Sequence, residues 1–169
     1  MEVFEAVRTM LAIRSYTDRP VSQESIRRIL EAARLTASSR NTQEWDFVVV
    51  QDRETLQRLA QLARTGGYIG GAALMIAVVV PEQTIGYADG ARAIQDMMLV
   101  AWEEGIGSNW VGNANTDEIK ALLGVPQDQY VLALVPFGYP DRTVGAGRKN
   151  RKPLSEVAHA GRFGEPYAG

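Results

Sequence analysis

Apolar residues recur at helical spacing in two segments near the N-terminus. In residues 2–12 they fall on one face of a predicted helix, at Phe4, Val7 and Leu11. A polar, irregular stretch then runs to Pro20. Ser22 is a suitable N-cap for a second helix. The apolar positions of that helix follow the i, i+3, i+4, i+7 pattern: Ile26, Ile29, Leu30 and Ala33.

Three apolar runs predict strands between and after further helices. Residues 45–50 and 130–137 are the first and last of these runs, and residues 73–80 form the central one. The central run shows no alternation, so we expect a strand that is buried on both faces. Asp52 is placed to cap a helix after the first strand, and Thr116 a helix that stops at Gly124.

The segment 90–104 is apolar almost all round, which predicts a helix covered by more than one neighbour. It is either the core helix of the domain or part of a subunit interface. A short strand is expected at 109–112, and an aperiodic tail rich in Gly, Arg and Lys follows Pro140. Without repeats or linkers, the pattern predicts a single α+β domain over residues 1–169, with helices packed on a sheet.

The amino-acid composition excludes several classes of catalytic and metal site. The chain has no cysteine and a single histidine, His159, so thiolate catalysis, Fe–S clusters and Cys-type zinc sites are excluded. No metal ligand and no catalytic side chain is assigned. A formal net charge of −2 argues against nucleic acid or an acidic membrane as the main partner. The acidic N-terminus does not resemble a signal peptide, and the apolar runs are too short to span a membrane, so a cytoplasmic protein is expected. Its chemistry would come from a bound cofactor.

Two features could bind such a ligand. The loop at 37–45 gathers small hydroxyls, amides and a Trp, which could hydrogen-bond a planar polar molecule; the alternative is an ordinary turn. Arg14 and the tail cations Arg148, Lys149, Arg151 and Lys152 could neutralise a phosphate; the alternative is solvated surface charge. No P-loop or Rossmann glycine pattern is present.

Taken in order, these segments resemble the nitroreductase family of FMN-dependent oxidoreductases. The similar segments are 13–21, 30–45, 105–112, 138–140 and 151–154. The resemblance implies a mainly antiparallel sheet flanked by helices and an extended C-terminal tail exchanged in a homodimer. It also implies FMN as cofactor, NADH or NADPH as reductant, and a small electron-poor acceptor (a nitroaromatic, a quinone or an activated alkene) reduced by a ping-pong mechanism.

The resemblance also assigns residues. Arg14 and the tail residues Lys149, Arg151 and Lys152 would hold the FMN phosphate. Ser38, Ser39 and Asn41 would come from the partner subunit and line the ring and ribityl chain. Trp110, Val111 and Gly112 would lie by the isoalloxazine, with a backbone N–H near its reactive nitrogen.

The chain departs from the family pattern at two points. Met10-Leu11-Ala12 stands where the family usually has Arg-Arg-Ser, so Arg14 and the tail would carry more of the phosphate charge. Glu44 replaces the common Pro before Trp45, so the 37–45 loop would be less rigid and more acidic. A flavin-binding or interaction protein without useful turnover therefore stays open as an alternative.

Overall fold

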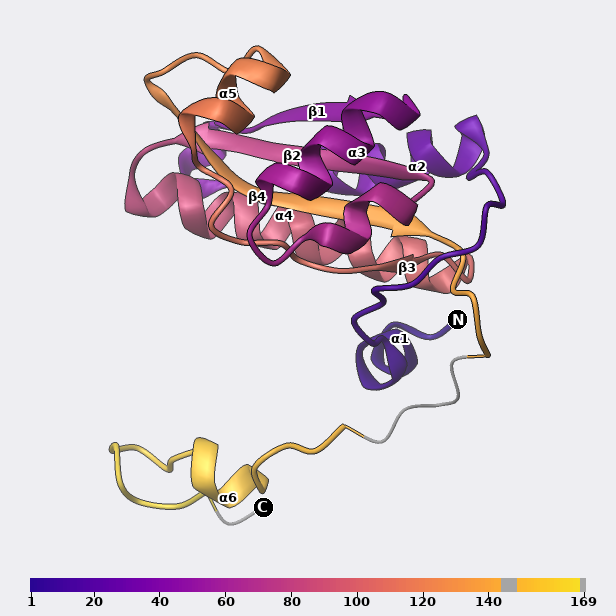
Figure 1. Cartoon of the computed structure of the whole chain (residues 1–169). Coiled ribbons are helices and arrows are strands. Elements are labelled where there is room, and N and C mark those ends of the chain that lie inside the picture. Colours follow the sequence, from indigo (N-terminus) through magenta and orange to yellow (C-terminus); the bar gives the residue numbers. More distant parts are fainter. Residues whose placement is uncertain (144–148, 168–169) are drawn as a thin grey trace.

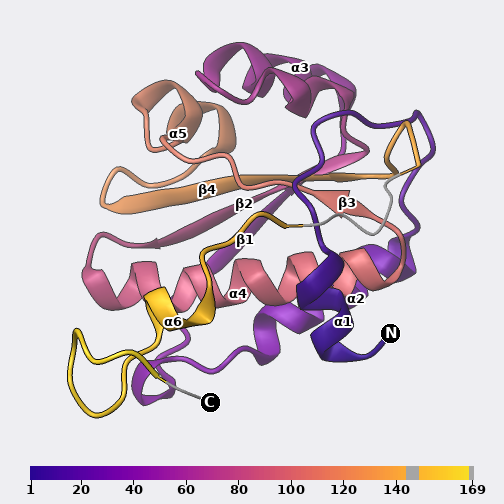
Figure 2. The ribbon, with the colours of Figure 1, turned by 90° about the horizontal axis from the view of Figure 1, so that it is seen from below.

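Four antiparallel strands form one sheet between two layers of helices in the computed structural model, which describes residues 1–143 and 149–167 (Figures 1 and 2). The sheet order is β1-β2-β4-β3. The strands are β1 Asp46–Val50, β2 Leu74–Pro81, β3 Gly107–Ser108 and β4 Gln129–Gly138. The α-helices are α1 Val3–Thr9, α2 Gln23–Leu35, α3 Arg53–Leu62, α4 Thr84–Glu103, α5 Asp117–Leu123 and α6 Leu154–Val157. Two short 3₁₀ helices are η1 Ser39–Asn41 and η2 Gly67–Gly71.

Strand β2 is the centre of two cores. It pairs with β1 on one side and β4 on the other, and its residues from Leu74 to Val80 are buried. Leu74, Ile76 and Val78 pack into the core beneath α2 and α4, whereas Met75 and Ala77 pack into the core beneath α3 and α5. The prediction of an unalternating strand buried on both faces is therefore confirmed, because helices cover both sides of the sheet (Figure 2).

The predicted helix starts are confirmed where a side chain caps the helix. Ser22 Oγ accepts the Ser25 N–H at 3.0 Å and starts α2. Asp52 and Thr116 make the equivalent bonds at the starts of α3 and α5. Gly124, at φ 68°, ends α5 in the left-handed conformation that glycine adopts without strain. Local side-chain chemistry thus fixes these boundaries.

The predicted boundaries of the helix α4 and of the strand β3 are wrong. Helix α4 begins at Thr84 rather than Gly90, so it includes the Tyr87–Asp89 turn that the sequence pattern left outside. The short strand lies at Gly107–Ser108 rather than 109–112, where Val111 forms only an isolated bridge to Leu134. The strand is displaced because the segment after α1 pairs with Ser108 at the edge of the sheet.

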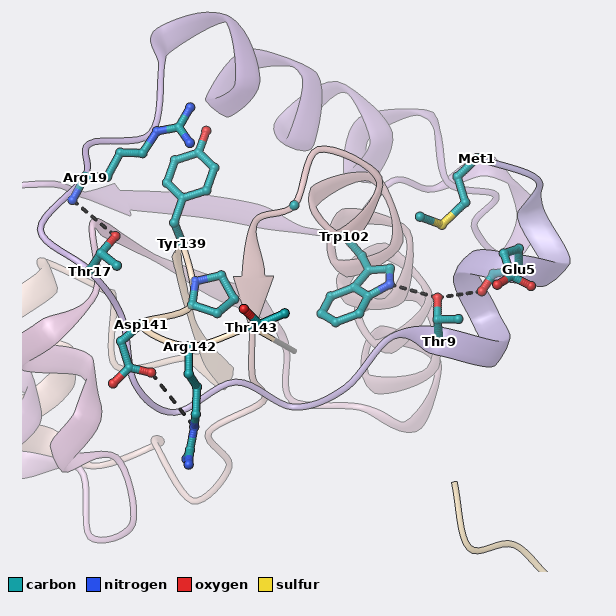
Figure 3. Close-up of a pocket in the computed structure, with 12 residues that line it drawn as sticks. Met1, Glu5, Thr9, Thr17, Arg19, Trp102, Tyr139, Asp141, Arg142 and Thr143 are labelled. Atoms are coloured by element: carbon teal, nitrogen blue, oxygen red, sulfur yellow. Dashed lines mark hydrogen bonds and ion pairs between the residues drawn. The ribbon is translucent and has the colours of Figure 1, made fainter. Parts of the chain in front are cut away.

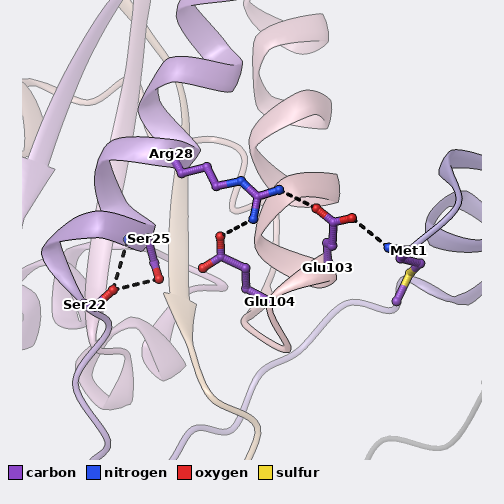
Figure 4. Close-up of polar contacts among 6 residues, drawn as sticks. All are labelled: Met1, Ser22, Ser25, Arg28, Glu103 and Glu104. Carbon is purple, nitrogen blue, oxygen red and sulfur yellow. Dashed lines mark hydrogen bonds and ion pairs between the residues drawn. The ribbon is translucent and has the colours of Figure 1, made fainter.

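Both ends of the chain expose apolar side chains. Helix α1 is shorter than the predicted 2–12 helix, and its Val3 and Phe4 are each 76% exposed. Figure 1 shows α6 and the tail lying apart from the helix and sheet layers, and Phe163 of the tail is 94% exposed. Polar contacts attach the N-terminus to the body: Glu103 binds both the Met1 amino group and Arg28 (Figure 4). No helix among the described residues is both long and apolar enough to cross a membrane.

Candidate functional site

Residues 11–16 run along the sheet edge formed by β3. The Ile13 N–H donates to the Ser108 carbonyl at 2.9 Å, and a side chain on Gly107 would place its Cβ 2.5 Å from Ile13. Similarly, a Cβ on Gly138 would lie 2.8 Å from the Tyr16 ring. Burial raises the pKa of the Tyr16 hydroxyl, which donates to the Ile13 carbonyl at 2.8 Å. The two glycines therefore allow the N-terminal segment to approach the sheet closely.

Arg14 lies in a hollow of about 510 Å³ between residues 11–15 and residues 140–143. Its side chain is exposed and forms no ion pair with any described residue. The acidic group in the same hollow, Asp141, already accepts a hydrogen bond from Ser15 at 2.5 Å and lies 4.0 Å from Arg142. The Arg14 guanidinium is thus available to bind an external anion.

The segment at 110–112 follows β3 and continues along the same edge of β4, where Val111 bridges to Leu134. The N–H and carbonyl of Val111 are both bonded to Leu134, each at 3.0 Å, and its side chain is buried. Among the described residues, nothing accepts a hydrogen bond from the N–H groups of Trp110 and Gly112. Trp110 is 38% exposed, and its Nε1 lies 3.4 Å from where a Gly112 Cβ would be. The N–H groups of Trp110 and Gly112 are therefore the candidate donors, and that of Val111 is not.

A second hollow, of about 740 Å³, shares residues 140–143 with the first (Figure 3). Trp102 lines it and donates its indole N–H to Thr9 at 3.0 Å. The Arg19 guanidinium lies 3.8 Å above the centre of the Tyr139 ring. Trp102 is thus half-buried at the wall of this cavity.

The loop with Ser38, Ser39 and Asn41 lies elsewhere, between α2 and β1. It is held by Asp89, whose carboxylate accepts the Ser39 N–H at 2.8 Å. Asp89 is near the start of α4, whereas β3 follows the end of α4, so at 1.5 Å per residue the two regions are about 20 Å apart. Among the described residues, the side chains of Ser39 and Asn41 have no hydrogen-bond partner. One protomer therefore does not bring this loop to Arg14.

The basic tail is also not gathered around Arg14. Lys149 donates its amine to the Val7 carbonyl of α1, and Arg151 donates to the Asn150 carbonyl beside it. Lys152 is exposed, and Arg148 lies outside the described residues. The hollow of Arg14 is lined by residues 11–15 and 140–143 instead.

The sequence pattern did not indicate two acidic residues, one in the Arg14 hollow and one beside the 37–45 loop. Asp141 lies in the Arg14 hollow, and Asp89 holds the 37–45 loop. An aspartate among the apolar residues of α4 is the signal that could have indicated Asp89, but the predicted helix began one residue later. Within residues 1–143 and 149–167, no group of three or more His, Cys, Asp or Glu side chains could hold a metal ion.

The donor set fits a ligand that is anionic at one end and planar and polar at the other. Arg14 supplies an unpaired cation, and the N–H groups of Trp110 and Gly112 supply donors beside a half-exposed indole. Such donors can stabilise developing negative charge on a planar ring without a titrating side chain. The site can therefore bind and orient a cofactor, and the carboxylate in its hollow, Asp141, already accepts a hydrogen bond from Ser15.

Comparison with known proteins shows which chains this one resembles. A family model described as the Nitroreductase family matches residues 8–79 and 71–139. A relative from Archaeoglobus fulgidus, with the provisional name NADH dehydrogenase/NAD(P)H nitroreductase, is 34% identical over 149 residues, which are 82% of this chain and 86% of the relative. The FMN reductase (NAD(P)H) of Bacillus subtilis is 28% identical over 184 residues, covering 94% of this chain and 73% of that protein.

Among solved structures, the chain is similar to the NADPH:FMN oxidoreductase of Vibrio harveyi in complex with NAD⁺. The TM-score is 0.86 at 26% identity, and the match covers 98% of this chain and 79% of the other. The sheet and helix layers described above are thus a known arrangement.

Proposed function

Because the chain belongs to the nitroreductase family, we propose that it is an FMN-dependent oxidoreductase that passes reducing equivalents from NADH or NADPH to a small electron-poor acceptor. One observation carries the proposal. Among the described residues, Arg14 has no ion-pair partner and the N–H groups of Trp110 and Gly112 have no acceptor, and all three residues lie along the same edge of the sheet. Relatives named FMN reductase and NADPH-flavin oxidoreductase support the cofactor and the reductant.

The residues at the sheet edge suit the two ends of FMN. Arg14 would bind the phosphate, where charge-assisted hydrogen bonds contribute most. The N–H of Trp110 or Gly112 would face the polar edge of the ring, and the half-exposed Trp110 indole would lie beside it. FMN, when bound, supplies the hydride exchange with the nicotinamide. The protein's part is to position the ring and to set its electrostatic surroundings.

The acceptor is proposed only as a chemical class. The lining of the hollow at Arg14, which has a volume of about 510 Å³, does not select one functional group on the acceptor. Nitroaromatics, quinones and activated alkenes are planar and electron-poor, so each could stack where the nicotinamide had been. Sequential use of one face predicts ping-pong kinetics, with the oxidised nicotinamide leaving before the acceptor binds.

We further propose a homodimer in which the partner's loop completes each site. The two half-sites of one protomer lie about 20 Å apart along α4, so one FMN cannot easily contact both within one chain. Val3, Leu35 and Leu99 line an apolar groove between α1, α2 and α4, and the tail exposes further apolar side chains. Such surfaces are typical of a chain that contacts another copy. Light scattering at micromolar concentration should give a dimer; a monomer with flavin still bound would contradict this proposal.

The cofactor and the turnover can be tested together. Flavin released by heat should be FMN by chromatography, and the yellow holoprotein should bleach with NADH or NADPH and recolour with a quinone. Recovery of FAD, or no binding of added FMN, would overturn the cofactor assignment. Bound FMN that does not bleach would favour a flavin-binding protein without turnover. That alternative stays open because Met10 and Ala12 replace residues of the family's usual Arg-Arg-Ser. The cytoplasmic location and the single domain over residues 1–169 stay predictions.

A further inference from the structure

Three polar residues on α4 hold the chain where α2 ends and the 37–45 loop begins. We call them the α4 seam: Asp89, Arg92 and Asp96. Each contacts a different residue of the segment that follows α2. Thr36 donates its hydroxyl to Asp96 at 2.6 Å, and the Ser39 N–H donates to Asp89 at 2.8 Å. Between these contacts, Arg92 donates to the Ala37 carbonyl at 3.3 Å.

The loop beyond the seam has an unfavourable backbone conformation. Arg40, Asn41 and Gln43 have φ values of 53°, 57° and 54°, in the left-handed region that L residues other than glycine rarely adopt. The Gln43 N–H donates to Ser38 Oγ at 3.0 Å and closes the loop on itself. Three such residues so close together need outside contacts to hold one conformation. The α4 seam holds the start of this loop, at residues 36–39, and Gln83 donates to Glu44 near its end at 3.4 Å.

Asp89 is the central member of the seam. It is only 2% exposed, which is unusual for a carboxylate, and it accepts from both the Ser39 N–H and the Arg92 guanidinium. Because it binds the backbone of Ser39, it leaves the Ser39 side chain free to contact something else. Burying a carboxylate costs free energy unless it is hydrogen-bonded. The burial of Asp89 against the Ser39 N–H therefore indicates that it holds this loop in one position.

We propose that Asp89 is a positioning residue for flavin binding. It fixes the 37–45 loop so that Ser39 and Asn41 present their side chains to the FMN held by a second copy of this chain. This inference rests on the proposed function, because only a bound flavin gives the loop a ligand. Asp89 itself does not touch the cofactor; it acts through the Ser39 backbone.

The test compares Asp89→Ala with Asp89→Asn, using Asp128→Ala as the control that removes an exposed carboxylate elsewhere. The first readout is hydrogen exchange of residues 36–44 in the protein without FMN. The second is the dissociation constant of FMN, from quenching of its fluorescence. Asp89→Ala should speed exchange in the loop about tenfold or more. It should also weaken FMN binding up to about tenfold, because Ser39 and Asn41 are then no longer held toward the cofactor and their neutral hydrogen bonds to it weaken. Asp89→Asn keeps an acceptor oxygen and should recover most of the affinity, and Asp128→Ala should change neither readout.

The possible results separate the two proposals. Faster exchange with unchanged FMN affinity would overturn the positioning role while leaving the cofactor assignment intact. Unchanged exchange would show that the seam does not hold the loop. A wild-type protein that does not bind FMN would overturn the proposed function and the inference with it. If Asp89→Ala does not fold, Thr36→Val removes the hydroxyl that donates to Asp96 and to the Ala32 carbonyl, leaves Asp89 in place, and should show the same changes at smaller size.

Discussion

The two halves of the candidate site are built in different ways. The Arg14 half is held by main-chain contacts: Ile13 bonds to the Ser108 carbonyl, and the Thr17 N–H donates to the Tyr139 carbonyl at 2.8 Å. The loop half, around Ser39, is held by side chains of the α4 seam. The backbone pairing at the sheet edge requires glycine at positions 107 and 138 but no particular side chain at positions 10 and 12, whereas the seam depends on its own side chains. The Arg14 half can therefore accept Met10 and Ala12, but the loop half should be sensitive to single substitutions.

The same difference explains why the halves complement each other. The Arg14 half offers a cation and backbone donors, which suit a phosphate and a ring edge. The loop half offers neutral side chains without partners in the described protomer, Ser39 and Asn41. The regions near the two ends of α4 thus offer different groups, which would suit the ligand that we propose to lie between two protomers.

The largest expected effect is on the charged half. Arg14→Ala should weaken FMN binding about 10- to 100-fold, since hydrogen bonds to charged groups contribute about 1.5–3 kcal/mol each. Arg14→Lys should recover only part of the loss, because an ammonium cannot reproduce the guanidinium geometry. Fluorescence quenching gives the affinities, and circular dichroism should show an unchanged fold.

Arg58→Ala removes another exposed arginine, on α3, and serves as the matched control. It should leave the FMN affinity unchanged. Wild-type affinity in Arg14→Ala would mean that the phosphate is bound elsewhere and that the match of residues 13–21 to the family motif is wrong.

A smaller effect is expected on the neutral half. The double variant Ser39→Ala/Asn41→Gly removes both free side chains, and glycine accepts the left-handed backbone at position 41. Neutral hydrogen bonds contribute about 0.5–1.5 kcal/mol each, so FMN binding should weaken about tenfold. Titration calorimetry can measure this change. A loss as large as that of Arg14→Ala would remove the distinction between a charged and a neutral half.

The smallest effect concerns the contacts that attach α1 to α4. The hydrogen bond from the Met1 amino group, and then that from Arg28, lowers the pKa of Glu103 below its ordinary value of 4.5 (Figure 4). A carboxyl with a lowered pKa stabilises the fold fully above that value and loses the contribution as the pH falls through its folded pKa. The difference in unfolding free energy between wild type and Glu103→Gln should therefore shrink below pH 4.5 and be constant above it, up to the pH at which the Met1 amino group loses its proton.

Urea unfolding across the acid range measures this difference, which should be small because the pair is exposed. A difference that persists undiminished at the lowest pH would show that the ionised Glu103 is not its source.

Much of the fold was predictable from local patterns, whereas the assembly of the site was not. Ser22, Asp52 and Thr116 cap their helices with their own side chains, so the sequence reveals these boundaries. The displacement of β3 was hidden, because it depends on Ile13 meeting Gly107 across a long separation in sequence. The role of Asp89 was hidden for the same reason, since its partner Ser39 is on another element.

The central claim, that each FMN site takes one half from each protomer, is tested most directly with a mixed dimer. Arg14→Ala chains and Ser39→Ala/Asn41→Gly chains, carrying different tags, are co-expressed and the heterodimer is purified through both tags. If the halves come from different protomers, one site carries both defects and the other carries none. The account predicts one site per heterodimer with wild-type FMN affinity. If no site of wild-type affinity is found while the wild-type dimer binds FMN normally, each protomer builds its own site and the account is wrong.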